Sequence, residues 1–472
     1  MASPREPRPT SARALPEDRG DATRAARVRT IALISPSGHG NLGDEAILAS
    51  TIENIRRRLP DARFVGITLN PDDTRRRFGI DAFPLAAISR PEFGVLDDKP
   101  IDAPTRASIP GNGWETPVAS VLRGIRRSTR SVLARFLKKA LRLVLSDAQL
   151  WSLVQDVRHM RAAYGLLRDV DLICVAGGGQ LDEYWGGPWG QPYALFKWST
   201  LARFRGIRLF VISVGYGTLN TRLGRFFVRR ALSRAAYRSY RDDGSRRLVQ
   251  RTGFAHDDPV VPDLAFGLDR EELVSASRLA AEAGTVCLSP MAYLDPGAWP
   301  DKDPIAHEAY LARLADIAAT LVAERRKVVL VSSDGPDRRT VAAVHARLAN
   351  RLSADELEFV SAPASDTVDR FLAIVAGADL LIASRLHGVL LSLVAGTPTL
   401  ALSYDRKVSA LMENMGLSVH CIDIEDFDPA QVVSGANAID AIMVSLRSDI
   451  ALRTRELAEQ VQGQFNRIVP ST

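Results

Sequence analysis

Cysteine is scarce in this chain. Its three cysteines, Cys174, Cys287 and Cys421, lie far apart in 472 residues and form neither a CxxC pair nor a Cys/His cluster. This spacing argues against a disulfide framework and against a metal site, and it indicates buried thiols in a reducing cytoplasm. We therefore expect a protein that works without a bound metal.

Long apolar runs are also absent from the sequence. No segment approaches the roughly 20 apolar residues that a helix needs to span a bilayer. Residues 1–29 are rich in Arg, Pro, Ala and acids and lack the apolar core of a secretory signal, so we expect a disordered tail and a cytoplasmic protein. The net charge of +6 is modest. It favours anionic small molecules or a membrane face, and we expect no nucleic-acid partner because basic and aromatic residues are not interleaved.

What the chain does contain is a repeated alternation of apolar runs with helical patterns, which predicts parallel sheets with crossover helices. At this length two domains are expected. The predicted fold is α/β, with two Rossmann-like doubly wound domains that face each other across a cleft. We place them at 30–268 and 284–439, between the tail at 1–29 and a C-terminal helix and tail at 440–472. That last helix is long enough to reach back across the domain boundary.

The expected strands are short apolar runs that end at glycine-rich or polar turns. In the first half they are residues 29–35, 63–69, 171–176 and 208–214. In the second half they are residues 285–289, 327–332, 357–360, 379–383, 399–402 and 418–423.

Residues 91–168 do not fit this alternation and are expected to be an insertion in the first domain. Within them, residues 122–145 place apolar side chains on one stripe of a helix and eight Arg or Lys side chains on its other faces, with no acid between them. That pattern is typical of a helix that lies on an anionic membrane surface. The alternative is a helix packed on its own domain with a solvated basic face.

The most informative motif is Ser384-Arg385-Leu386-His387, where a buried strand turns into a helix expected at 388–395. The free N–H groups at such a helix start attract phosphates and carboxylates. Arg385 adds a rigid fork for a planar anion, and His387 adds a group that can move a proton near neutral pH. The alternative is that Arg385 pairs with a surface acid and His387 bonds to a backbone carbonyl.

Two further cations also stand at strand ends. Lys407 follows the apolar run 399–402, and Arg241 ends a short strand in the first half. Both could reach an anion bound in a cleft, since parallel sheets place their ligands at the carboxyl ends of strands. For Arg241 the alternative is an ion pair with Asp242 or Asp243.

Two glycine-rich turns in the first half carry acids. Residues 38–45 contain a GxGxxG spacing without the Lys-Ser/Thr of a P-loop, and Asp44 and Glu45 would repel a phosphate there. These carboxylates suit sugar hydroxyls instead. Residues 177–182 are similar, with three glycines followed by Asp182 and then Tyr184. The alternatives are that Asp44 only stabilises a helix start and that the second loop only packs its aromatic residues.

Taken in order, six motifs resemble the polysaccharide pyruvyl transferase family over about residues 30–90 and 169–417. They are residues 40–48, Gly177-Gly178-Gly179, Arg241-Asp242 with Ser245, Asp263, residues 384–387, and Tyr404 with Lys407. The resemblance implies a GT-B-like pair of Rossmann-type domains. It also implies transfer of the enolpyruvyl unit of phosphoenolpyruvate onto two hydroxyls of one sugar, giving a pyruvate ketal and phosphate. The donor is implied to lie near Arg385 and His387.

The expected roles follow from the residues and from this resemblance together. His387 is the expected general acid, and Asp44 or Asp182 is expected to orient or deprotonate the acceptor. The expected donor-binding residues are Arg385, Arg241, Lys407 and Ser384. The expected acceptor-binding residues are Asn41, Gly43, Glu45, Gly178, Gly179 and Tyr184. Phosphoenolpyruvate would be a co-substrate, and no cofactor is expected.

Two other functions fit parts of the pattern. A GT-B glycosyltransferase with a nucleotide-sugar donor would share the fold and the anion site but would release a nucleotide. A non-catalytic glycan-binding homologue would bind the acceptor and turn nothing over. In the favoured reading the acceptor is a sugar or lipid-linked glycan, which places the protein in the cytoplasm or at the inner face of the membrane.

Overall fold

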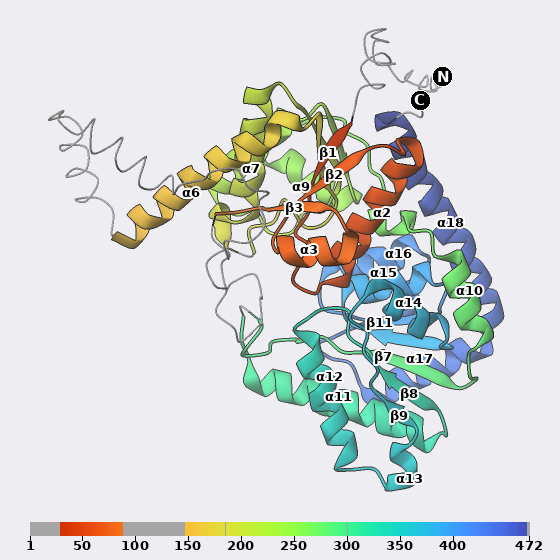
Figure 1. Cartoon of the computed structure of the whole chain (residues 1–472). Helices are drawn as coiled ribbons and strands as arrows, with labels where there is room; N and C mark the ends of the chain where they lie inside the picture. The colour runs from red at the N-terminus through yellow and green to blue at the C-terminus, as the bar shows by residue number, and fades with distance from the viewer. Residues whose placement is uncertain (1–28, 88–146, 185, 300, 470–472) are drawn as a thin grey trace, which may run out of the picture.

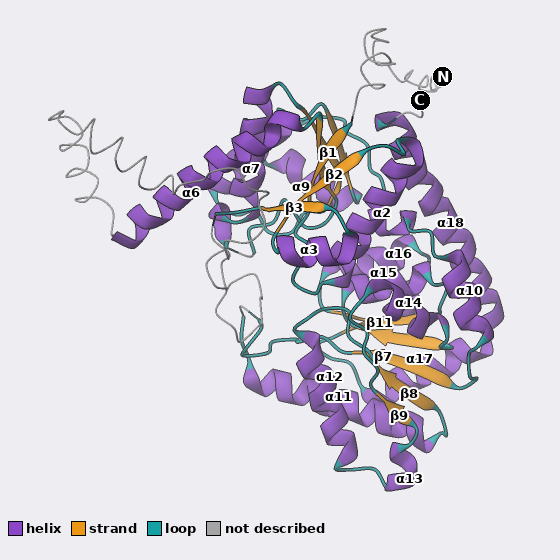
Figure 2. Cartoon of the chain, viewed as in Figure 1, coloured by secondary structure: helices purple, strands orange, loops and turns teal. Residues whose placement is uncertain are grey.

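The computed structural model describes residues 29–87, 147–184, 186–299 and 301–469 (Figure 1). These residues form two six-stranded sheets with helices packed around them (Figure 2). The predicted α/β fold with two Rossmann-like domains is confirmed. Residues 1–28 of the expected tail and the basic helix expected at 122–145 lie outside the described residues. Within these residues, no helix is long and apolar enough to cross a membrane.

The N-terminal sheet has the strand order β3-β2-β1-β4-β5-β6, and all of its neighbouring strands are parallel. Its strands are β1 (Thr30–Ile34), β2 (Arg63–Thr68), β3 (Asp81–Pro84), β4 (Leu172–Ala176), β5 (Arg208–Val214) and β6 (Tyr237–Tyr240). The helices of this half are α2 (Leu42–Arg58), α3 (Pro71–Phe78), α6 (Asp147–Leu166), α7 (Gln191–Arg205), α8 (Arg222–Leu232) and α9 (Asp243–Arg251).

The C-terminal sheet has the order β12-β11-β10-β7-β8-β9 and is also parallel. Its strands are β7 (Thr285–Ser289), β8 (Lys327–Leu330), β9 (Val360–Ser361), β10 (Leu380–Ala383), β11 (Thr399–Ser403) and β12 (Cys421–Asp423). The helices of this half are α10 (Glu271–Leu279), α11 (Pro304–Ala323), α12 (Asp337–Ala349), α13 (Ala354–Leu357), α14 (Val368–Ala376), α15 (Leu386–Val394), α16 (Arg406–Asn414), α17 (Pro429–Ala441) and α18 (Met443–Ile468).

Both sheets reverse their strand order at one place, between β1 and β4 and between β7 and β10. At such a switch point the loops at the carboxyl ends of the two strands diverge and leave a crevice, where open α/β sheets bind their ligands. The loop after β1 leads into α2, and the loop after β10 leads into α15. The candidate functional residues are therefore those near the starts of these two helices.

The strand predictions hold where both faces of a strand are buried. In β1, Ile31 and Leu33 pack into one core, while Ala32 and Ile34 pack into the core on the other face of the sheet. A strand covered on both faces is apolar throughout, which is why such runs were recognisable in the sequence. The described strands also include β3, which was not predicted.

One predicted strand was wrong in most of its length. Residues 354–357 form the short helix α13, and β9 begins only at Val360. The reason is a capping box, in which the Ser353 hydroxyl accepts from the Glu356 N–H and the Glu356 carboxylate accepts from the Ser353 N–H. This local hydrogen bonding favours a helix start and overrides the apolar character of Leu357.

The last helix reaches back to the N-terminal domain, as predicted (Figure 1). It is preceded by a break at Ile442, so that α17 and α18 replace the single helix expected from residue 440. On α18, the buried Gln464 amide donates to Ser213 Oγ at 3.1 Å and accepts from the Ser239 hydroxyl. Ser213 has a positive φ of 49°, at an irregularity between β5 and β6. A residue from the end of the chain thus satisfies a strained position in the first domain.

Candidate active site

The helix α15, which carries the Arg-Leu-His motif, crosses from the C-terminal sheet to the N-terminal domain. It packs against α2 and against the 3₁₀ turn η4 (Leu264–Gly267). It begins at Leu386, two residues before the predicted start, and its N-cap Arg385 makes no capping bond with its side chain. The first N–H groups of α15 therefore have no side-chain cap at the contact between the domains.

His387 packs directly on Gly43, in the first turn of α2. A Cβ on Gly43 would lie 1.8 Å from Cγ of His387, so only glycine allows the imidazole to sit there. The ring is largely buried, and its Nε2 has no hydrogen-bond partner among the described residues. Burial lowers the pKa of His387, while the nearby carboxylates of Asp263 and Asp44 act to raise it. Gly43, predicted to bind the acceptor, thus makes room for the predicted acid.

Asp263 lies between His387 and Arg241. Its Oδ1 accepts from the N–H of Ala265 at 3.0 Å, which caps η4 and fixes the carboxylate. Its Oδ2 is 3.9 Å from His387 Nε2 and 3.4 Å from Arg241 Nη1. Asp263 belongs to the motifs of the family resemblance, but the sequence alone indicates no role for it. Its position beside the imidazole makes it the candidate for a residue that orients His387.

Arg241 is held at the end of β6 by carboxylates. It pairs with Asp263 and also with Asp242, whose Oδ2 is 3.5 Å from Nε. Its guanidinium lies over Gly215, where a Cβ would be 2.7 Å from Nη2. Arg241 is predominantly buried, but the negative charges of Asp263 and Asp242 outweigh the effect of burial and raise its pKa. The alternative pairing with Asp242 is therefore present in the structure, while a role of Arg241 in binding an anion stays a prediction.

Asp44 lies on the N-terminal side of the same contact. Its Oδ2 is 3.9 Å from Nε2 of His39, and its Oδ1 lies against Gly178, where a Cβ would be only 3.3 Å away. Burial raises the pKa of Asp44, and His39 and His387 oppose that change. Gly178 has a φ of +68°, so glycine suits this position both for its backbone and for the close approach of the carboxylate.

Arg385 forms an ion pair with a buried acid, Asp337. Its Nε and Nη2 donate to the two oxygens of Asp337 at 2.9 and 2.8 Å, and Nη2 lies 3.4 Å from Asp334. Asp337 is fully buried, and burial raises its pKa to about 6 against the opposing charge of Arg385. The fork predicted to grip the donor thus holds a buried carboxylate at the start of α12. Ser384, predicted as a donor ligand, shares a 3.0 Å hydrogen bond with the Tyr310 hydroxyl.

Removing the carboxylate of Asp337 should test whether this pair supports the fold. We expect Asp337→Asn to lower the free energy of unfolding by up to about 3–5 kcal/mol, because the buried Arg385 would lose the carboxylate that accepts two of its hydrogen bonds and would keep only Asp334, at 3.4 Å. Urea unfolding followed by circular dichroism measures this change. The exposed Asp355→Asn is the matched control and should stay within about 0.5 kcal/mol of the wild type. Equal stability of the two variants would show that Arg385 does not depend on Asp337.

Aromatic residues line the other side of the cations. The Lys407 ammonium lies 5.5 Å from the Tyr404 ring centre, and Arg385 lies 5.8 Å from the ring of Trp299. Trp299 in turn neighbours Tyr404 at 5.9 Å and Tyr184 at 6.5 Å. The predicted acceptor residue Tyr184, from the N-terminal domain, is thereby brought next to the cations of the C-terminal domain. Trp299 was missed because its loop after β7 has no motif beyond its position at a strand end.

The Asp182 carboxylate accepts hydrogen bonds from the backbone of two loops. Its Oδ1 accepts from the N–H groups of Tyr184 at 2.8 Å and Thr218 at 2.9 Å. Two such bonds occupy one oxygen of the carboxylate, so the loops after β4 and β5 are tied together at the edge of the site. Gly179, in the same loop, faces open space, since nothing lies within 4 Å of the position of its Cβ.

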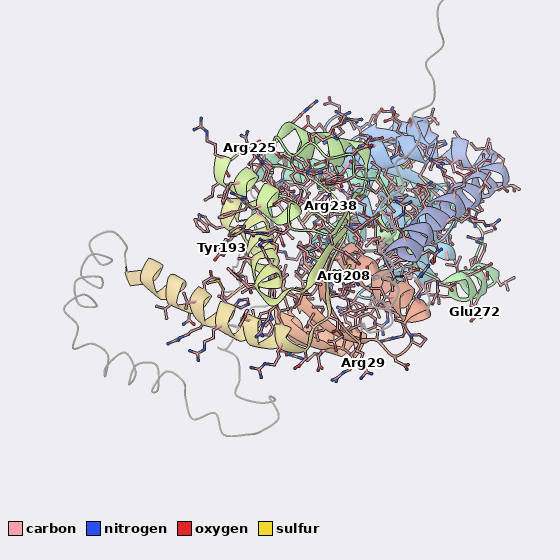
Figure 3. All side chains as sticks on the ribbon, turned by 90° about the horizontal axis from the view of Figure 1, so that it is seen from above. Arg29, Tyr193, Arg208, Arg225, Arg238 and Glu272 are labelled. Atoms are coloured by element: carbon pink, nitrogen blue, oxygen red, sulfur yellow. The ribbon has the colours of Figure 1, made fainter. Side chains whose placement is uncertain are left out.

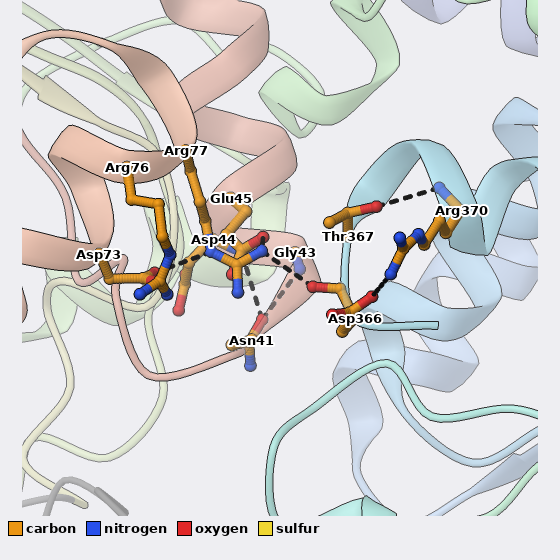
Figure 4. Close-up of polar contacts among 10 residues, drawn as sticks. All are labelled: Asn41, Gly43, Asp44, Glu45, Asp73, Arg76, Arg77, Asp366, Thr367 and Arg370. Atoms are coloured by element: carbon orange, nitrogen blue, oxygen red, sulfur yellow. Dashed lines mark hydrogen bonds and ion pairs between the residues drawn. The ribbon is translucent and has the colours of Figure 1, made fainter. Parts of the chain in front are cut away.

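Two predicted acceptor residues connect the domains instead of facing the histidine. Asn41 caps α2 by accepting from the N–H groups of Gly43 and Asp44, and its side-chain amide donates to Asp334 at 3.3 Å. Glu45 is turned toward Arg77, which pairs with it at 3.0 Å and also donates to the Asp366 carbonyl at 2.8 Å (Figure 4). Burial raises the pKa of Glu45 to about 8. Asp44 and Glu45 are adjacent in sequence, but Asp44 lies beside His39 whereas Glu45 pairs with Arg77.

Unpaired polar atoms gather where the two helix starts meet. Among the described residues, five buried side-chain atoms without a hydrogen bond lie at the strand ends, loops and helix starts of this contact: Ser37 Oγ, His39 Nδ1, Ser289 Oγ, Ser333 Oγ and His387 Nε2. Ser333 and Ser289 flank Gly388 in the first turn of α15, at 3.2 and 3.5 Å from the position of its Cβ. A buried polar atom left unpaired costs about 1–3 kcal/mol, so such a concentration is typical of a site that receives a ligand or water.

The structure thus has two Rossmann-like sheets whose switch points face each other, with a histidine, carboxylates and cations at the contact. This arrangement defines the protein as a two-domain α/β protein of the GT-B-like class. A family model described as polysaccharide pyruvyl transferase matches residues 41–406. The chain belongs to this family of transferases.

Solved structures support the fold alone, because their sequence identities are low. MnaA of S. aureus in complex with UDP is 9% identical, with a TM-score of 0.52 over 93% of this chain and 96% of that chain. The UDP-GlcNAc 2-epimerase of Neisseria meningitidis bound to UDP-GlcNAc is 9% identical, with a TM-score of 0.51 over 94% and 100%. That of Methanocaldococcus jannaschii is 8% identical, with a TM-score of 0.51 over 87% and 92%. No curated protein sequence matches this chain significantly.

Proposed function

We propose that this protein transfers the enolpyruvyl unit of phosphoenolpyruvate to two hydroxyls of one sugar, in a polysaccharide, cell-wall glycan or glycolipid precursor. The products are a pyruvate ketal and phosphate. The observation that carries the proposal is the position of His387, packed on Gly43 and placed between Asp263 and Asp44. Membership of the family supports the same reaction class.

The reaction needs a proton at one carbon and two additions at its neighbour. His387 gives its proton to the methylene carbon, which becomes the methyl group, while the first hydroxyl adds to the adjacent carbon. The carbon–oxygen bond to phosphate then breaks, and the second hydroxyl adds to the same carbon. One hydroxyl proton restores His387 and the other leaves with phosphate, so protons and electrons balance. Asp44, with His39 beside it, is the group we propose to orient the hydroxyls and accept their protons.

The donor carries a carboxylate and a phosphate, which need several positive groups. We propose that Arg241, Lys407 and the first N–H groups of α15 bind them. Burial acts to lower the pKa of Lys407, but its interactions with neighbouring groups, among them the Asp405 carboxylate, raise it overall, so this side chain is a cation at neutral pH. Arg385 would act indirectly, because its two bonds to Asp337 fix the start of α15. The proposed reaction needs no cofactor beyond phosphoenolpyruvate as co-substrate.

The identity of the donor substrate distinguishes this proposal from its alternatives. The full-length protein would be incubated with phosphoenolpyruvate and a panel of soluble and lipid-linked glycans, with phosphate release and the ketal methyl group measured together. We expect one phosphate for each ketal formed. Release of a nucleotide from a sugar nucleotide, with phosphoenolpyruvate left intact, would identify a glycosyltransferase. Glycan binding without turnover of either donor would identify a binding protein.

The pH dependence should reflect the lowered pKa of His387. Because the imidazole must be protonated to act, we expect kcat/KM for phosphoenolpyruvate to fall as pH rises through a value below the ordinary histidine pKa. The bound donor adds negative charge beside the ring, so the corresponding fall in kcat should lie at higher pH. Steady-state rates measured from mildly acidic to alkaline pH test both points. A kcat/KM that increases with pH over this range would exclude His387 as the acid.

A further inference from the structure

A long stretch of this chain contains no acidic residue. Between Glu183 and Asp242 the sequence has only basic and neutral residues, and this stretch forms α7, β5, α8 and β6. Five of its arginines are exposed on α7 and α8: Arg203, Arg222, Arg225, Arg229 and Arg230. Within the part of the chain that the structure describes, none of these five forms an ion pair with a carboxylate. Their charge is therefore available to a partner.

Large apolar side chains lie exposed among these arginines. Trp189, Phe204, Leu223 and Phe226 are 53%, 74%, 37% and 46% exposed, respectively. A single exposed apolar residue needs no explanation, but these four lie on elements that pack together: Trp189 on the 3₁₀ turn η3 (Gly187–Trp189), Phe204 on α7, and Leu223 and Phe226 on α8. Together with the five exposed arginines, we call these residues the α7/α8 surface. Figure 3 shows Tyr193 and Arg225, from the two helices, on the same outer side of the molecule.

The exposed rings rest on a packed aromatic layer and are not loosely attached. The Phe226 ring lies 6.0 Å from Phe196 of α7, and Trp189 lies 5.6 Å from the buried Phe227 of α8. Phe204 is eight residues after Phe196, so it continues the same stripe of α7 about 12 Å further along the axis. The Arg230 guanidinium lies 5.7 Å from the Phe226 ring centre. Apolar and cationic groups thus share one rigid face.

The nearest acids do not neutralise this face. Glu183 is buried and accepts from the N–H groups of Asn220 and Thr221 before α8. Asp156 of α6 pairs with Lys197 at 3.0 Å and accepts from the Tyr193 hydroxyl.

We propose that the α7/α8 surface docks this protein on an anionic lipid bilayer, with Phe204, Leu223, Phe226 and Trp189 in the interface and the arginines on lipid phosphates. Exposed aromatic and aliphatic side chains surrounded by arginine, with no acid, match a bilayer surface, where apolar acyl chains lie beneath negatively charged headgroups. A purely polyanionic partner would satisfy the arginines but would leave the four apolar side chains in water. The proposal does not depend on pyruvyl transfer, although it would bring the active site close to a lipid-linked acceptor.

Co-sedimentation of the full-length protein with vesicles tests this proposal. We expect binding to vesicles of phosphatidylglycerol mixed with phosphatidylcholine at low salt, and little binding to phosphatidylcholine alone. Phe204→Ser with Phe226→Ser should lower the partition coefficient about tenfold at low and high salt, because an apolar contribution is not screened. Arg225→Gln with Arg229→Gln should lower it about tenfold at low salt and much less at high salt.

The control removes comparable apolar groups elsewhere. Leu279 and Ile305 are 91% and 84% exposed in the C-terminal half, and Leu279→Ser with Ile305→Ser should bind as the wild type does. Wild-type protein that stays in the supernatant at low salt would overturn the proposal. So would equal binding of the wild type and both test variants, since the docking region would then lie elsewhere. Loss of binding in the arginine variant alone would identify a surface for soluble polyanions and not for a bilayer.

Discussion

Replacing His387 with glutamine is expected to lower kcat for ketal formation by about 10²–10⁴-fold, the usual contribution of a positioned general acid. Glutamine can keep a polar contact with Asp263 but cannot deliver a proton to carbon. Donor binding should survive in part, because Arg241, Lys407 and the α15 N-terminus would still hold the anion. Single-turnover rates, together with calorimetric binding of phosphoenolpyruvate, separate the two effects.

His345→Ala is the control for that experiment. His345 is partly exposed on α12 and takes no part in the candidate active site, so its loss should leave kcat and donor affinity unchanged. If His387→Gln retained near-normal turnover, the imidazole would have no role in proton transfer, and Asp263 would no longer be explained as the residue that orients it.

Gly43→Ala is expected to lower activity by at least about 10²-fold, since a displacement of about 1 Å at reacting groups can cost that much. The added methyl group would meet His387 at 1.8 Å, and either the imidazole or the contact between α2 and α15 must move. Overpacking of this kind also costs about 1–3 kcal/mol of stability. Turnover and the midpoint of urea unfolding would be measured on the same preparation.

A glycine in another helix provides the matched control. Gly463 lies inside α18 with nothing within 4 Å of the position of its Cβ. Gly463→Ala should therefore leave activity unchanged and add about 0.5–1 kcal/mol of stability, because alanine is the better helix former. A Gly43→Ala variant that behaved like Gly463→Ala would mean that His387 does not rest on α2 in the working enzyme.

The sequence was sufficient for the central strands of the two sheets and for the residues at their switch points. Strands such as β1, β4, β7 and β10 are buried on both faces, so they appear as continuous apolar runs that end in a recognisable turn. Because carboxyl ends of parallel strands share one edge, His387, Asp44 and Arg241 could be expected to converge. The structure brings these three side chains into one electrostatic neighbourhood.

Partners chosen by the tertiary fold could not be predicted in the same way. Asp337 follows no motif and lies 48 residues before Arg385. Its carboxylate nevertheless accepts hydrogen bonds from Nε and Nη2 of Arg385, the guanidinium that was predicted to bind the donor. The contact of His387 with Gly43 joins two domains and leaves no local pattern in either. Glu45 shows the same limit, since one residue of helical rotation turns it from the side of Asp44 toward Arg77. By contrast, the capping box before α13 was a local signal that could have been recognised.

The position of Gln464 has a consequence for how the chain is made. Domains generally fold in the order in which they are synthesised, the N-terminal one first. Here the first sheet leaves the ribosome with the Ser213 N–H able to donate to Ser239 Oγ, but with both hydroxyls still lacking the amide that bonds to them, because Gln464 follows the whole C-terminal domain in sequence. The N-terminal sheet therefore acquires its final hydrogen bonds only after the second domain has been synthesised. The N-terminal domain therefore reaches its final structure only late in translation, when α18 has been synthesised.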